Sequence, residues 1–150
     1  MTKDIKKIRD KIDSLDNEIL ELLNERAQQA VEISKEKEKS KSNDNFYNPE
    51  REAQVIRRIK ELNKGPLSED NIQRLYREIM SACLSLEAPL KVSYLGPEGT
   101  YTQLAAKNHF GSSILAMPCP SVEEVFASVE KRDSHYGVVP VEKSTQGIVS

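Results

Sequence analysis

The sequence predicts an α+α/β protein, in which a bundle of three helices is followed by a smaller segment of alternating strands and helices. Apolar residues repeat with a helical period up to Pro89, and Gly65 is the only glycine in that part of the sequence. After Pro89 come short β-branched runs separated by glycine and proline turns. We therefore expect two domains, residues 1–89 and residues 90–150.

The first helix is expected over about residues 3–39, because apolar residues step along it by threes and fours. This apolar seam comprises Ile5, Ile8, Ile12, Leu15, Ile19, Leu22 and Ile33. Arg26 falls within the seam, where a buried charge must either be paired or await an anion. Lys37 lies three turns later and about 20° round the helix, at 100° per residue, so the two cations point in nearly the same direction.

The length of the first helix also predicts how the chain assembles. At 1.5 Å per residue it is roughly 50 Å long, much longer than the helices beside it. A helix whose apolar seam overshoots its own bundle usually meets a second copy, so we expect a homodimer through this helix.

Two further helices have recognisable start and stop signals. Asn48-Pro49 is typical of an N-cap followed by the first helical position, and predicts a helix that stops at Gly65-Pro66. Ser68 predicts the N-cap of a third helix that ends before Pro89. The expected apolar stripe of the third helix is Ile72, Leu75, Ile79, Cys83 and Leu86.

The remaining residues predict a parallel α/β lobe. Strands are expected over 90–96, 114–117 and 136–142, with a helix after each of the first two. The second of these helices begins at a Ser121 N-cap. An α/β lobe usually needs more than about 60 residues, so we expect this one to be incomplete.

Charged residues on apolar faces are the candidate site of the helical half. Glu52 shares the apolar face of its helix, and Glu87 continues the apolar line of the third helix in steps of four. Arg51 precedes Glu52, and Arg9 lies beside the seam of the first helix. Cations that outnumber carboxylates suit a small organic dianion, since guanidinium groups bind carboxylates bidentately.

The type of catalysis follows from what the helical half contains. It has no histidine and no metal-type cluster of ligands, so we expect no metal and no cofactor. It also offers no evident pair of nucleophile and base. The pattern therefore favours catalysis by positioning and electrostatics.

The helical half resembles the all-helical class of chorismate mutase over about residues 4–88. The resemblance rests on the segments IRDKIDSLDNEILELLNERAQQAVEISKEK, NPERE and REIMSACLSLE. It implies a chorismate substrate and a unimolecular [3,3] rearrangement of chorismate to prephenate, a step in the biosynthesis of phenylalanine. It also implies that no proton is transferred and no cofactor is used.

The resemblance implies a role for each charged residue. Arg26 would grip one substrate carboxylate, and Arg9 from the partner chain would grip the other. Lys37 would hydrogen-bond the ether oxygen of the breaking bond, and a protonated Glu87 would face the same oxygen. Glu52 would hold the ring hydroxyl.

Three other family positions have weaker assignments. Arg51 would support the site electrostatically. Asn48 stands where aspartate is common and Cys83 where a small hydroxyl residue can occur. Plain structural roles compete with these assignments: a simple N-cap for Asn48, a small core residue for Cys83, and a structural ion pair between Arg26 and Glu52.

The second half resembles the start of prephenate dehydratase over about residues 91–150, through the segments VSYLGPEGTYTQLAA and VVPVEKSTQGIVS. This implies a periplasmic-binding-protein-like lobe with Thr100, Glu142 and Ser144 as candidate substrate contacts. Thr100 and Gln103 also form a capping-box pattern at a helix start.

Two features of this second half depart from the dehydratase pattern. Lys143 stands where the family usually has asparagine. The Thr-Arg-Asp motif that carries dehydration in the family does not occur in the 150 residues. We therefore expect a truncated dehydratase segment and no dehydratase activity from this chain.

Composition excludes several other classes of protein. The net charge of −2 gives no drive toward nucleic acid, and no apolar run is long enough to span a membrane. Two cysteines make no disulfide framework and the N-terminus has no secretory signal, so we expect a cytoplasmic protein. The alternative is a non-catalytic helical dimerisation module with a ligand-binding α/β lobe, which would have little use for inward charges.

Overall fold

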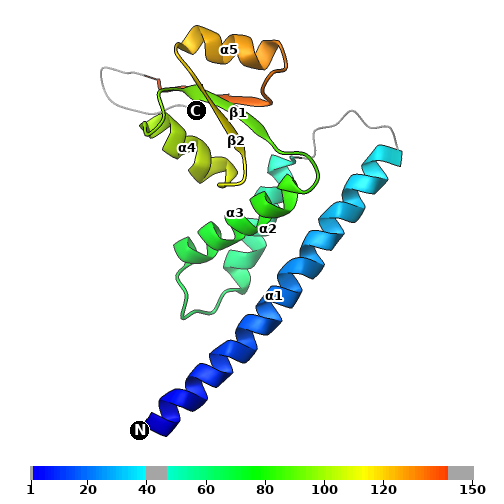
Figure 1. Ribbon diagram of the computed structural model, residues 1–150, viewed down its shortest axis with the longest axis vertical. Coiled ribbons are helices and arrows are strands. Elements are labelled where there is room, and N and C mark those ends of the chain that lie inside the picture. Colours follow the sequence, from blue (N-terminus) through cyan, green and yellow to red (C-terminus); the bar gives the residue numbers. More distant parts are fainter. Residues whose placement is uncertain (1, 40–46, 142–150) are drawn as a thin grey trace. The chain divides into compact units, whose positions relative to one another are not determined.

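The computed structural model describes residues 2–39 and 47–141, which belong to two compact units, residues 1–43 and 44–150 (Figure 1). The first unit is the helix α1, Thr2–Lys39, which confirms the long first helix. Its apolar seam is open, because the seven seam residues are each between 42% and 62% exposed.

The second unit begins with a helical hairpin of α2, Pro49–Leu62, and α3, Glu69–Ser85. The predicted caps are confirmed: Asn48 Oδ1 accepts a hydrogen bond from the Arg51 N–H at 3.1 Å, and Ser68 Oγ accepts one from the Asn71 N–H at 3.2 Å. The two helices pack through a small apolar cluster of Val55, Ile56 and Met80, with Ile59 and Tyr76 against it.

The buried face of α3 differs in part from the predicted stripe. Cys83 is buried as predicted, but Leu75 and Leu86 are exposed, and Met80 and Ser81 are buried in their place. The reason is that α3 has two neighbours within this unit. Met80 packs against α2, whereas the Ser81 hydroxyl accepts a hydrogen bond from the Ser113 N–H beyond the hairpin.

The rest of the unit is the predicted α/β segment. Its strands β1, Lys91–Leu95, β2, Leu115–Cys119, and β3, Tyr136–Val138, form a parallel sheet in the order β2-β1-β3. The helices α4, Tyr101–Phe110, and α5, Val122–Glu130, cover opposite faces of it (Figure 1). The central strand is buried, and its Tyr94 lies in register with Pro118 of β2.

The third strand is shorter than predicted. It ends at Val138, two residues before Pro140. Val138 lies in register with Tyr94, and β1 itself ends at Leu95, so β1 offers no partner to a longer third strand.

One side chain of the helical half lies in the core of the α/β segment. Tyr47, directly before the cap of α2, is 6% exposed and packs with Leu90, Val92, Ala106 and Phe110. Its ring centroid lies 5.5 Å from that of Phe110 and 5.4 Å from that of Tyr136, both edge-on. The start of α2 is therefore anchored in the α/β core.

A polar contact joins α3 to the end of α4. The Glu78 carboxylate accepts hydrogen bonds from the Ser112 N–H at 3.0 Å and from the Ser112 hydroxyl at 3.1 Å. Gly111, just before it, has a positive φ of 86° and approaches Ser81 closely. The hairpin and the α/β segment thus share both an apolar and a polar contact surface.

Candidate functional site

The two cations predicted on α1 lie in the less exposed, C-terminal part of the helix. Arg26 and Lys37 are both half-buried. Arg26 lines a surface depression of about 440 Å³ and Lys37 another of about 380 Å³, and Gln29 lines both. Their shared neighbour supports the prediction that both cations lie along one side of the helix. Arg9, nearer the N-terminus, is exposed.

The first turn of α2 carries the next group of predicted residues. Asn48 acts as the N-cap, which confirms that structural role. Arg51 is exposed, and its Nη1 donates to Gln54 Oε1 at 3.4 Å. Glu52 points back into the unit, where its Oε1 lies 3.4 Å from Arg77 Nη1 of α3.

Arg77 is a partner that the sequence pattern did not single out. The side chains of Glu52 and Arg77 are only 14% and 20% exposed, so their ion pair is largely shielded from water. A signal for it exists in the sequence, since Arg77 lies between Tyr76 and Met80 on the side of α3 that packs. An arginine amid apolar positions is the same signal that pointed to Arg26.

The end of α3 provides the last two predicted residues of the helical half. Cys83 is buried, and Glu87 is half-buried in the turn that follows the helix, with its N–H donating to the Leu84 carbonyl at 2.9 Å. Since α2 and α3 run antiparallel, the start of α2 and the end of α3 lie at one end of the hairpin (Figure 1). Asn48, Arg51 and Glu52 thus lie towards the same end of the hairpin as Cys83 and Glu87.

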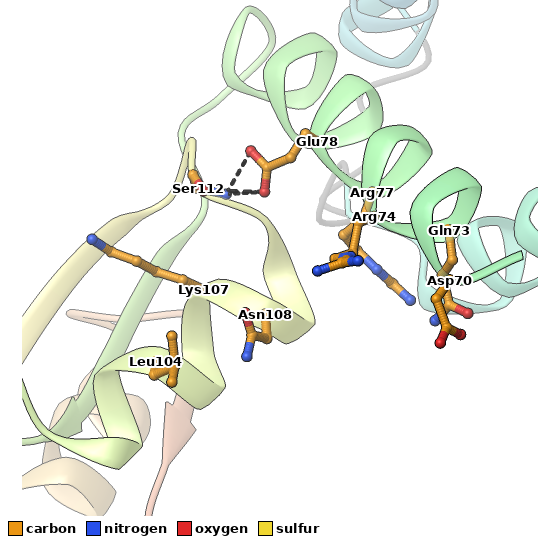
Figure 2. Close-up of a pocket in the computed structure, with 9 residues that line it drawn as sticks. All are labelled: Asp70, Gln73, Arg74, Arg77, Glu78, Leu104, Lys107, Asn108 and Ser112. Atoms are coloured by element: carbon orange, nitrogen blue, oxygen red, sulfur yellow. Dashed lines mark hydrogen bonds between the residues drawn. The ribbon is translucent and has the colours of Figure 1, made fainter. Parts of the chain in front are cut away.

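A cavity of about 780 Å³ lies between α3 and α4 and was not predicted. Figure 2 shows the guanidinium groups of Arg74 and Arg77 projecting from α3 towards it, with Asn108 on the α4 side. Glu78 lines it as well, but its carboxylate is held by Ser112. Arg77 therefore borders this cavity and also reaches Glu52.

The capping-box pattern predicts the start of α4 correctly, but not the bonds that its two side chains make. Thr100 is the N-cap, but its side chain makes no capping bond to the described backbone of α4. Its hydroxyl lies 3.4 Å from the Leu95 carbonyl and 3.0 Å from the Thr102 hydroxyl, while Gln103 accepts from the Gly99 N–H at 2.6 Å. The hydroxyl is oriented instead towards the end of β1, where it donates to the Leu95 carbonyl. Thr100 lines a cavity of about 710 Å³.

The remaining candidates of the second half, Glu142 and Ser144, lie outside the described residues, as does Lys143 between them. In the described ranges, no group of three or more His, Cys, Asp or Glu side chains is placed to hold a metal ion. Among the helices that the structure describes, none is long and apolar enough to cross a membrane.

The charge of Glu52 also affects the pKa of the Tyr47 phenol. Burial raises the pKa of the Tyr47 phenol to about 12, with the Glu52 carboxylate and Tyr136 acting in the same direction and Arg77 in the opposite one. The folded protein therefore holds the neutral phenol at a pH where an unfolded chain ionises it, near pH 10.

This raised pKa makes alkaline stability a test of the Tyr47 environment. The stabilising contribution of the neutral phenol is fully present below about pH 10 and is lost as pH rises through about 12. We expect the melting temperature to fall over this range, and to fall less in Tyr47→Phe, which keeps the ring. Tyr94, whose pKa burial also raises, is common to both proteins. An equal fall in both would contradict the assignment.

Comparison with known protein families matches two parts of the chain. The family model for Chorismate mutase type II covers residues 8–88, and the model for Prephenate dehydratase covers residues 92–150. The bifunctional chorismate mutase/prephenate dehydratases of Pseudomonas aeruginosa and Stutzerimonas stutzeri are 50% and 52% identical over 149 residues, which is 97% of this chain and 41% of each relative.

The bifunctional chorismate mutase/prephenate dehydratase of Neisseria gonorrhoeae is 51% identical over 141 residues, 94% of this chain and 38% of its own length. The chain thus spans about two fifths of the length of these curated relatives. The match over residues 8–88 takes in more than half of the chain and includes every charged site residue of the helical half, from Arg9 to Glu87. The chain belongs to the chorismate mutase type II family.

Proposed function

We propose that the helical half rearranges chorismate to prephenate. The observation that carries this proposal is the family match over residues 8–88, a range that contains Arg26, Lys37, Glu52 and Glu87. The structure adds support, because the two cations of α1 are half-buried and Glu52 is held by an ion pair away from water. The two cations suit a dianionic substrate, and a carboxylate can accept a hydrogen bond from its hydroxyl.

The proposed mechanism uses only positioning and charge. Arg26 and Arg9 of the partner subunit hold the two substrate carboxylates and select the chair-like conformer that reacts. As the ether bond breaks, negative charge develops on its oxygen, and Lys37 and a protonated Glu87 stabilise that charge. Glu52 accepts a hydrogen bond from the ring hydroxyl. No proton leaves or enters the substrate.

A direct assay tests this proposal. Loss of chorismate absorbance is followed with the purified chain, before and after treatment with EDTA. We expect turnover in both cases, because arginine, lysine and glutamate side chains suffice for this chemistry. Loss of turnover on chelation would contradict the electrostatic mechanism. No turnover in either case would favour the non-catalytic dimerisation module.

We further propose that the active form is a homodimer through α1. The open seam supports this, since a row of seven apolar side chains is stable in water only when another surface covers it. The proposed role for Arg9 also needs a second copy.

The dimer is tested by solution mass. Light scattering is expected to give twice the mass of one chain. Ile12→Glu places a charge in the seam and is expected to give the mass of a single chain, with loss of mutase activity because Arg9 no longer reaches a partner's site. A parent protein with the mass of one chain would contradict the proposal.

The α/β segment is proposed to be part of a prephenate-binding, periplasmic-binding-protein-like lobe. The family match over residues 92–150 and the parallel sheet support this. We also propose a cytoplasmic location, because two cysteines are too few for a disulfide framework and suit a reducing compartment.

A further inference from the structure

We infer that Arg77 is a positioning residue for the Glu52 carboxylate. The inference rests on the proposed mutase function, in which Glu52 binds the ring hydroxyl of the substrate. Arg77 stands at no position that the mutase resemblance assigned. What points to it is the ion pair that joins the first turn of α2 to the middle of α3.

The geometry of the pair determines where the carboxylate lies. A glutamate side chain has several rotatable bonds, and one on a helix surface samples many rotamers. Glu52 is tied at Oε1, 3.4 Å from Arg77 Nη1, and the pair is mostly buried. Because water screens a shielded pair less than a surface pair, the attraction is strong enough to select one rotamer. A carboxylate oxygen has two lone pairs, so holding Arg77 does not prevent Glu52 from accepting a hydroxyl.

The surroundings keep the pair in place. Arg77 projects from a helix whose neighbouring Tyr76 and Met80 pack on α2, so its backbone is fixed relative to Glu52. The Tyr47 ring, held in the α/β core, is close enough for both charges to influence its phenol. The Glu52–Arg77 pair therefore lies near a ring that is fixed in the α/β core.

Arg74 provides a matched control. It lies one turn earlier on α3 and lines the same cavity as Arg77 (Figure 2). Its Nη2 donates to Asn71 Oδ1 at 2.7 Å on its own helix, and not to Glu52. Substituting Arg74 therefore removes the same charge from the same helix without touching the Glu52 carboxylate.

The test compares kcat/KM for chorismate in variants whose folding is verified by melting temperature. Arg77→Met is expected to lower kcat/KM by a factor of about 10 or more, since a small misplacement of a binding group is costly. Arg77→Lys, which keeps the charge, is expected to recover part of that loss. Arg74→Met is expected to stay within about twofold of the parent. If Arg77→Met does not fold, Arg77→Gln takes its place in every comparison.

A double-mutant cycle separates positioning from general destabilisation. If Arg77 acts through Glu52, then adding Arg77→Met to Glu52→Gln lowers kcat/KM by no more than about twofold. If the fold-losses in kcat/KM of the two single variants multiply in the double variant, the inference is overturned. It is also overturned if Arg77→Met is as active as Arg74→Met. An inactive parent would overturn the proposed mutase function itself, which is a different result from an active parent that is insensitive to Arg77.

Discussion

Arg26→Ala and Lys37→Ala are each expected to lower kcat/KM for chorismate by a factor of about 100 or more, or about 3 kcal/mol of transition-state stabilisation. In the proposed mechanism Arg26 holds a carboxylate throughout the reaction, and Lys37 stabilises charge that appears only as the ether bond breaks. Lys37→Ala should therefore act mainly on kcat, whereas Arg26→Ala should also raise KM.

The control for this prediction lies on the same helix. Lys35 is exposed and pairs at 3.7 Å with Glu32, an interaction of a surface kind that contributes little. Lys35→Ala is expected to stay within about twofold of the parent. All three variants should fold, because alanine is the best helix former and the three residues lie on a regular helix. Near-normal turnover by a well-folded Arg26 or Lys37 variant would count against the proposed site.

Gly111→Ala is expected to lower the free energy of unfolding by about 3 kcal/mol or more. Gly111 has φ 86° and ψ 171°, a conformation open essentially to glycine alone. A Cβ at this position would collide with the Cβ and Oγ of Ser81. The end of α4 would have to move away from α3, which would also break the bonds between Ser112 and Glu78.

Gly99→Ala is the matched control for this stability effect. Gly99 has a similar φ of 83°, but an added Cβ there meets nothing within 4 Å. Its substitution should cost only the backbone strain, about 1–2 kcal/mol. Thermal melts of the two variants compare Gly99→Ala, which adds backbone strain alone, with Gly111→Ala, which adds backbone strain and a steric collision. Equal melting temperatures would contradict the close approach of Gly111 to Ser81.

The parts of the fold that the sequence predicted well are those set by neighbouring residues. Asn48, Ser68 and Ser121 each cap a helix through a side-chain oxygen that accepts from an N–H three residues later. Such bonds depend only on local geometry, so the sequence reveals them directly. Glu52 and Glu87 were identifiable for a similar reason, since each lies within a short run of characteristic family residues.

The features that the sequence did not predict depend on contacts between distant residues. The partner of Glu52 is 25 residues away and depends on how α2 and α3 are rotated against each other. Tyr47 packs on Phe110 and Tyr136, which belong to a different part of the chain. Thr100 is a further case: it caps α4 as the local pattern predicts, but its hydroxyl is directed to the carbonyl at the end of β1. A single site that brings together the five charged side chains stays a prediction; these are Arg9, Arg26, Lys37, Glu52 and Glu87.

The register of the sheet has a consequence for how the chain resists aggregation. β2 is an outer strand of the described sheet, and outer strands offer N–H and C=O groups that can recruit a strand of another molecule. Pro118, opposite Tyr94, has no N–H to offer and so interrupts that row. The other outer strand, β3, spans only three residues, Tyr136–Val138. Both edges of the described sheet are thus poor templates for strand addition, which lowers the tendency of the protein to form fibres by that route.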